Sequence, residues 1–163
     1  MKILIRICLL CAVAGGLVAQ QPDQDTEVRA LMAAFLEAFN NLNWPAFRNC
    51  WTDNPVVFMP SAAFTPTGKR IDDPVSFEAS WHLVFDTIRQ AAQRRGVTGP
   101  PFQTLEPKDL RVDFPAPTVA VVTFHLGSGS TNVLARRMFV VAKTAKGWRI
   151  THLHASNLSL TPN

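Results

Sequence analysis

The sequence of 163 residues contains no tyrosine and only three cysteines, and charged residues make up 17% of it. Cys8 and Cys11 lie in the apolar amino-terminal segment, so Cys50 is the single cysteine in the rest of the chain. One cysteine cannot form an internal disulfide, and we therefore expect buried apolar side chains to stabilise the fold. Cys50 lies beside Trp51 in an apolar helical pattern, which favours a small buried residue over a reactive nucleophile.

The chain also has no large excess of positive or negative charge. The formal net charge is +4, and without Lys2 and Arg6 the chain has 14 basic against 12 acidic groups. The basic pairs Arg94–Arg95 and Arg136–Arg137 are not interleaved with aromatic residues, so we expect no nucleic-acid partner. A hydrophobic content of 47% and this length indicate one globular domain.

Residues 1–19 have the pattern of a secretory signal peptide: a basic start, an apolar run over Ile7–Val18 and a small residue, Ala19, at the junction. The run is shorter than the roughly 20 residues of a membrane span, and the alternative left open is an uncleaved anchor. We expect cleavage after Ala19, export to a periplasmic or extracellular location, and no stable membrane association afterwards. Residues 20–25 are expected to be a flexible leader, 26–158 the domain and 159–163 a tail.

The order of the elements predicts an α+β domain, with helices first and strands later. Asn43 and Asp73 can each cap a helix that has a proline in its first turn, the first short and the second long. A further helix is expected over 26–41, ahead of the short one. Turns are expected at 52–55 and 127–130, and strands at 56–60, 102–114, 118–126 and in a hairpin over 135–158.

The final hairpin has the most informative pattern. Strict alternation after the turn at Thr144–Gly147 puts five residues on one face of the last strand: Trp148, Ile150, His152, His154 and Ser156. This face begins apolar and ends polar, which suits a strand that first packs a core and then lines a cavity. With an even number of loop residues, Arg137 on the preceding strand lies opposite His154 on the same face.

The run Gly147–Ser156, GWRITHLHAS, resembles the last strand of SnoaL-like and ketosteroid-isomerase-like domains of the nuclear-transport-factor-like superfamily. The resemblance is closest to the branch with the association domain of calcium/calmodulin-dependent protein kinase II, and it covers residues 26–158. It implies a cone-shaped, curved antiparallel sheet wrapped around a long helix, two amino-terminal helices and a pocket at the open end. It implies no particular reaction, because this fold hosts catalysts, binders and assembly modules.

At several positions this chain differs from the patterns of the related domains, and these differences exclude some of their functions. The positions of the catalytic aspartate and tyrosine of ketosteroid isomerases correspond to Met59 and Phe35, so that reaction is not expected. Kinase association domains have an arginine where this chain has Ala155, which weakens any transfer of anion binding. Related domains form homodimers through the outer face of the sheet, and we expect the same here, with Leu153 and Ala155 on that face.

The leading hypothesis is an exported domain that binds a small apolar or weakly anionic molecule. Its expected polar base is Arg137, His152, His154 and Ser156, and its expected apolar walls are Phe58, Trp81, Phe85 and Phe124, with Trp44 at the rim. Three alternatives stay open: a cofactor-independent cyclase, isomerase or hydratase with His154 or His152 as general base, a non-catalytic association module, and a purely structural role for the polar group. No cofactor is expected. No metal is expected either, because the carboxylates lie in other segments than His125 and the last-strand histidines.

Overall fold

The computed structural model describes residues 21–60, 70–127 and 133–159, so the expected signal peptide, the glycine-serine turn after Gly127 and most of the tail lie outside the described residues. Within these ranges the chain forms three helices and five strands. In chain order they are α1 (Gln21–Asn40), α2 (Trp44–Asn49), β1 (Trp51–Phe58), α3 (Pro74–Arg94), β2 (Pro107–Ala116), β3 (Val119–Gly127), β4 (Val133–Thr144) and β5 (Gly147–Ser159). The predicted α+β class and the helical entry are confirmed.

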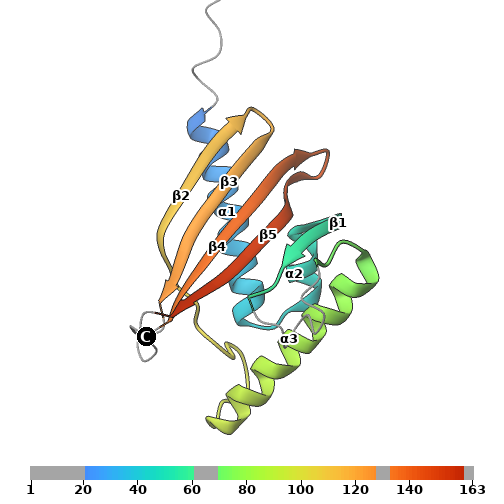
Figure 1. The fold of residues 1–163 in the computed structure, drawn as a ribbon, viewed down its shortest axis with the longest axis vertical. Helices are drawn as coiled ribbons and strands as arrows, with labels where there is room; N and C mark the ends of the chain where they lie inside the picture. The colour runs from blue at the N-terminus through green and yellow to red at the C-terminus, as the bar shows by residue number, and fades with distance from the viewer. Residues whose placement is uncertain (1–20, 61–69, 128–132, 160–163) are drawn as a thin grey trace, which may run out of the picture.

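The five strands form one sheet in the order β1-β5-β4-β3-β2. β2 to β5 pair antiparallel with their neighbours in the chain, whereas β1 pairs parallel with β5. The sheet is therefore mixed, and the expectation of a wholly antiparallel sheet is wrong at this edge. The physical reason is the path of the chain: α3 and the segment after it cross to the far edge, and the meander then returns to β1 (Figure 1).

Helix α1 runs behind the sheet, and α3 crosses the end of the sheet near β1 (Figure 1). We call the sheet face toward α1 the inner face and the opposite one the outer face. Glu27 on α1 accepts hydrogen bonds from Lys143 Nζ (3.1 Å) and Trp148 Nε1 (2.8 Å) on the final hairpin. Both bonds lower the pKa of the Glu27 carboxyl, and the bond from Lys143 has the larger effect. They also connect α1 to the sheet.

Both predicted helix caps are present. The Asn43 side chain accepts a hydrogen bond from the Ala46 backbone amide at 3.2 Å, and the Asp73 side chain accepts one from Ser76 at 2.8 Å. The start of α1 differs from the prediction, because this helix begins at Gln21 and so includes most of the expected flexible leader. The polar residues at its start form the first turns of a helix whose apolar positions begin later.

Two strand boundaries also differ from the prediction. The expected turn at 52–55 lies inside β1, where the pairing with β5 is interrupted between Trp51 and Val56. Turn-forming residues are therefore accommodated in an irregular edge strand. β2 begins at Pro107 and not at Phe102, so the residues before it connect α3 to the sheet.

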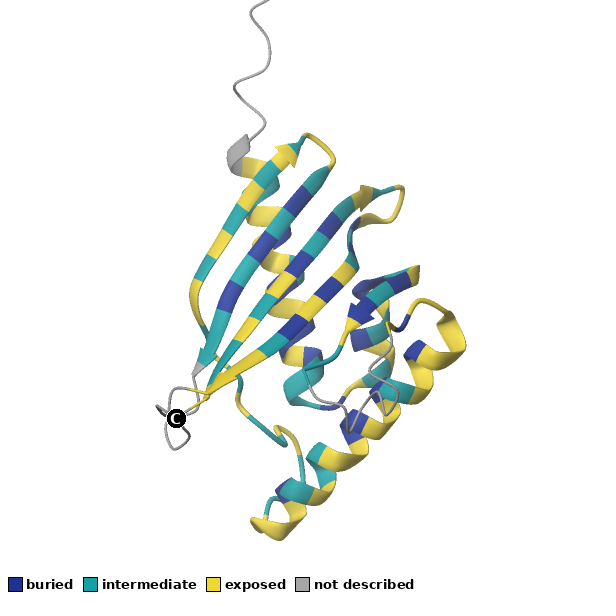
Figure 2. Cartoon of the chain, in the orientation of Figure 1, coloured by how far each residue is buried: buried dark blue, intermediate teal, exposed yellow. Residues whose placement is uncertain are grey.

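The core is rich in aromatic side chains, and Phe47 of α2 lies at its centre. The Phe47 ring centroid is 4.7 Å from that of Trp81, 5.2 Å from Phe85 and 5.3 Å from Phe35. The predicted stripe on α3 is buried at Phe77, Trp81, Phe85 and Ala92, and Ile88 is partly buried against it. Figure 2 shows buried positions alternating with intermediate or exposed positions along the central strands, as expected for a sheet with one covered face.

The alternation breaks once on β5. Val141 pairs with Ile150, but the next residue of β4, Val140, pairs with His152, so Thr151 is an extra residue on β5. Its hydroxyl group donates a hydrogen bond to the Val140 carbonyl oxygen at 3.2 Å. A bulge of one residue exchanges the two faces of the strand beyond it.

Candidate functional site

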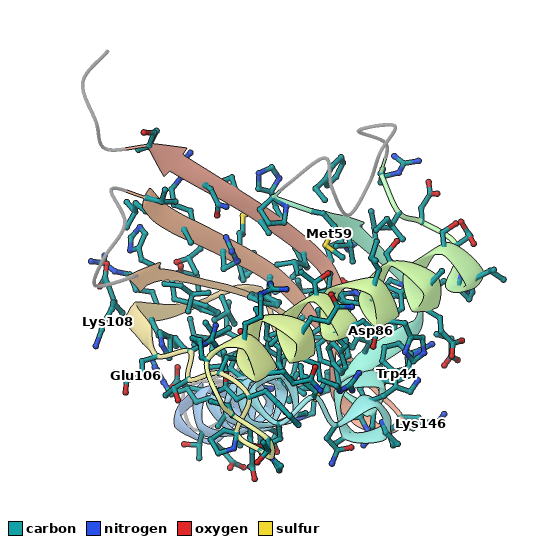
Figure 3. The ribbon with its side chains drawn as sticks, turned by 90° about the horizontal axis from the view of Figure 1, so that it is seen from below. Trp44, Met59, Asp86, Glu106, Lys108 and Lys146 are labelled. Carbon is teal, nitrogen blue, oxygen red and sulfur yellow. The ribbon has the colours of Figure 1, made fainter. Side chains whose placement is uncertain are left out.

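A cavity of about 250 Å³ lies between the inner face of the sheet, α1 and α3. Its described lining is apolar except for Gln103 and Arg137; the apolar members are Phe35, Leu36, Phe39, Met59, Pro60, Trp81, Val84, Ile88, Leu105, Phe124, Leu126, Phe139, Leu153 and Ala155. In Figure 3 Met59 lies at the end of β1 beside α3. The predicted pocket within the domain therefore has a counterpart in the structure.

Arg137 brings a positive charge to this apolar lining. It lies on β4 between Phe124 of β3 and Ala155 of β5 in the register of the sheet. Its Nη1 atom donates to the carbonyl oxygens of Arg136 (2.8 Å) and Ser156 (3.1 Å) and, at 3.4 Å, to Asn157 Oδ1. Burial lowers the pKa of the guanidinium group, and no carboxylate in the described ranges forms an ion pair with it.

Two further polar groups belong to residues that line the cavity. Trp81 Nε1 and Gln103 Nε2 are buried and have no hydrogen-bond partner among the described residues. The sequence predicts Trp81 as an apolar wall and does not indicate its unpartnered N–H group. Gln103 was missed entirely, because it lies in the connection between α3 and β2, where the sequence predicts the start of a strand and a single glutamine gives no sign of burial.

Asn40, at the end of α1, places Gln103 at the cavity. The Phe102 backbone amide donates to the Asn40 carbonyl oxygen at 2.9 Å, and the Leu105 amide donates to Asn40 Oδ1 at 3.0 Å. The segment on both sides of Gln103 is therefore anchored to α1. A single asparagine that binds a distant segment in this way leaves no pattern in the sequence.

Of the predicted wall residues, Trp81 and Phe124 line the cavity, and Arg137 of the predicted polar base does so too. Phe85 lies in the aromatic core and is not among the lining residues. Trp44 packs on the other side of α3, with its ring centroid 4.4 Å from that of His82 (Figure 3). Phe58 is 44% exposed and contacts the ring of His154 at a centroid distance of 5.8 Å.

The predicted position of Arg137 opposite His154 on one face is wrong, although both residues and Ser156 border one hollow on the outer face. Arg137 pairs with Ala155, and His154 pairs with Met138. Because of the extra residue Thr151, Leu153 and Ala155 are buried on the inner face with Trp148 and Ile150, whereas His152 and His154 are exposed. The expectation that Leu153 and Ala155 lie on the outer face is wrong for the same reason.

The outer face has its own hollow of about 260 Å³, lined by residues that include His154, Ser156, Arg136, His125 and Met138. No three metal-binding side chains (His, Cys, Asp or Glu) come together among the described residues. In the same part of the chain, no helix is long and apolar enough to cross a membrane. Of the polar residues expected at the base of the pocket, His154 and Ser156 border the outer hollow, and Arg137 borders both this hollow and the inner cavity.

Comparisons with known proteins agree with this architecture. Residues 28–160 match the family model of the SnoaL-like domain, and no curated protein matches the chain. An NTF2-like protein of unknown function from Pseudomonas putida KT2440 is similar in structure, with a TM-score of 0.64, 18% identity and coverage of 83% of this chain and 87% of that one.

Two other similar structures carry functional descriptions. A proposed ketosteroid isomerase from Shewanella frigidimarina has a TM-score of 0.58 and 20% identity, with coverage of 82% of this chain and 97% of that one. The association domain of CaMKII from C. elegans has a TM-score of 0.57 and 11% identity, with coverage of 84% and 98%. At these identities the likeness concerns the fold, and it does not place the chain in one branch.

Proposed function

This chain belongs to the SnoaL-like domain family, and we propose that it binds a small, largely apolar molecule in the cavity between α1, α3 and the inner face of the sheet. The observation that carries the proposal is a cavity of about 250 Å³ with an apolar lining and a few polar groups. Binding sites for small molecules typically have this composition, because apolar surface supplies affinity and a few polar groups fix orientation. Filling the space would restore contacts that the surrounding side chains otherwise lack.

The composition of the lining favours binding over acid–base catalysis. Phe35 and Met59, at the positions of the tyrosine and aspartate of ketosteroid isomerases, both line the cavity. The described lining contains no histidine, carboxylate or thiol that could exchange a proton near neutral pH. His152 and His154, the candidate bases of the enzyme hypothesis, are exposed on the outer face.

A cavity-filling variant tests the proposal. Ala155 lines the cavity, and Ala155→Phe would place a ring in it. The same exchange at Ala145, an exposed residue between β4 and β5, is the matched control. We expect the purified protein to bind cinnamyl alcohol or hexanol by isothermal titration calorimetry, Ala155→Phe to weaken this binding at least tenfold, and Ala145→Phe to leave it unchanged.

Circular dichroism of each variant separates a blocked cavity from a misfolded chain. Introducing a larger side chain into a core costs about 1–3 kcal/mol, which a folded domain tolerates. Binding that survives in a folded Ala155→Phe variant would place the ligand elsewhere, and no binding of any apolar probe by the unmodified protein would refute the proposal.

A second candidate function is assembly through the outer face, as in an association module. Phe58 and Met138 are 44% and 43% exposed, and both pair with His154, one from each side. Two large exposed apolar side chains on either side of the His154 ring favour a protein partner over water. We propose that this partner is a second copy of the chain. As part of the same proposal, the nearest relatives of the chain are the kinase association domains.

Export is also proposed, on the pattern of residues 1–19 alone. Cleavage after Ala19 would leave α1 intact, since this helix begins at Gln21.

A further inference from the structure

We propose that the cavity selects a ligand with a carboxylate at one end, which Arg137, Gln103 and Trp81 recognise together as hydrogen-bond donors. The inference rests on the proposed function, since it requires that the cavity be the binding site. It adds the chemical class of the ligand. It also assigns a polar role to Trp81 and Gln103, which the sequence pattern does not indicate.

Arg137 brings a positive charge to the cavity. Its three hydrogen bonds to described residues are all donated by Nη1, and all go to uncharged oxygens. The guanidinium group stays protonated at physiological pH and can offer further N–H groups in a planar fork. A partly buried charge without a counter-ion is unfavourable, and a ligand carboxylate would supply the counter-ion in the geometry that this fork prefers.

Trp81 and Gln103 each bring an unpartnered donor to the cavity. Buried N–H groups almost always have a hydrogen-bond partner, and of the three side-chain donors without one among the described residues, two belong to this cavity and the third is Trp51 Nε1 in the core. The indole N–H of Trp81 can only donate, and the Gln103 atom left without a partner is the amide nitrogen, which also only donates. A ligand that satisfies both must present acceptor oxygens.

The three donor residues come from different parts of the chain. Trp81 lies on α3, Gln103 on the segment after α3, and Arg137 on β4, and all three line one cavity. The described lining contains no carboxylate that could compete for them or bind an amine. This donor set therefore favours an anion over a neutral carbonyl and rejects a cation.

The test compares probes that share an apolar body and differ in the polar end. We would titrate the purified protein at neutral pH with hexanoate and cinnamate, with hexanol and cinnamyl alcohol, with hexylamine, and with methyl cinnamate as the uncharged carbonyl compound. We expect the carboxylates to bind at least tenfold more tightly than the alcohols and the ester, and the amine to bind most weakly.

Single substitutions assign the effect to the three residues. Trp81→Phe keeps a ring in place but removes the N–H group, and Gln103→Leu removes the amide; we expect each to weaken carboxylate binding about three- to tenfold. Arg137→Met removes the charge, and we expect a loss of about tenfold or more. Arg136→Met, on the other face of the same strand, is the matched control and should change nothing.

The indole N–H resonance of Trp81 gives a direct readout in ¹H–¹⁵N spectra. It is identified by its absence in Trp81→Phe, and it should move downfield with hexanoate and much less with hexanol. This measurement decides the matter even if Arg137→Met does not fold.

The outcomes separate the two proposals. If alcohols and carboxylates bind equally and the three variants weaken neither, the cavity is a binding site but the carboxylate inference is wrong. Equal binding of methyl cinnamate and cinnamate would refute the requirement for charge. If no probe binds, both the proposed function and this inference fail.

Discussion

At the scale of single residues, Thr151 determines which side chains of β5 reach the candidate site. It is the extra residue in the pairing of β5 with β4, and beyond it the two faces of β5 are exchanged. Leu153 and Ala155 therefore line the cavity, while His152 and His154 are exposed on the other side. Because of this one extra residue, β5 contributes apolar side chains to the described cavity lining and contributes no histidine.

Cys50 offers a prediction at the same scale. Burial raises the pKa of its thiol to about 11, against a smaller opposite effect of the Arg149 charge. Well below that pKa only a small fraction of the thiol is ionised, and the side chain is 5% exposed. We therefore expect no reaction of the folded protein, prepared without residues 1–19, with Ellman's reagent at pH 8.

Unfolding in guanidinium chloride should release one reactive thiol in the same preparation, and Cys50→Ser should release none. Labelling of the folded protein as fast as that of the unfolded protein would show that Cys50 is accessible.

At the scale of secondary-structure elements, the helices are defined by their ends. α3 begins at Pro74 after the cap Asp73, and α2 begins at Trp44 after the cap Asn43. A cap satisfies a backbone amide that has no partner within the helix. The position of α3 matters for function because Trp81, Val84 and Ile88 line the cavity.

The Asp73 cap predicts how stability depends on pH. Hydrogen bonds from Ser76 lower the pKa of the Asp73 carboxyl below its ordinary value of 3.8. The stabilisation is therefore complete above the ordinary value and is lost as the pH falls through the lower value in the folded state. We expect Asp73→Asn, which keeps an acceptor at the cap, to match the unmodified protein at neutral pH but to lose less stability in acid.

Urea unfolding at a series of pH values measures this difference. Asp73→Ala, which has no acceptor, should be less stable than both at neutral pH. If Asp73→Asn and the unmodified protein respond identically to acid, the carboxyl group of Asp73 does not contribute to the pH dependence.

At the scale of the whole molecule, the sheet has two faces with different environments. α1 covers the inner face, and the outer face is uncovered in the single chain (Figure 1). The row of Phe58, His154 and Met138 across β1, β5 and β4 lies on that uncovered face. A stable interface of standard size would bury roughly 1,200–2,000 Å² in total, and a five-stranded sheet can supply such an area.

We therefore predict a homodimer through the outer face. Phe58→Asp should weaken dimer formation at least tenfold in sedimentation equilibrium, because a charge would be buried at the interface. Val75→Asp is the control, since Val75 is 79% exposed and belongs to α3 and not to the row of Phe58, His154 and Met138. A monomer at micromolar concentration in the unmodified protein, or equal effects of the two substitutions, would contradict this prediction.

The sequence by itself determined the features that depend on neighbouring residues. The caps at Asn43 and Asp73, the apolar stripe of α3 and the turn of the final hairpin were all predicted correctly. Each of these follows from hydrogen bonds or side-chain periodicity within a few residues of the chain. The α+β class follows from the order of these elements.

The tertiary structure decided which side chains meet at the site. The bulge at Thr151 exists only in the pairing of two strands, and strict alternation along one of them predicts the opposite face for His154. Gln103 reaches the cavity because Asn40, more than sixty positions earlier, binds the residues around it. Contacts between distant segments depend on the packing of the whole chain, so no local pattern of residues specifies them.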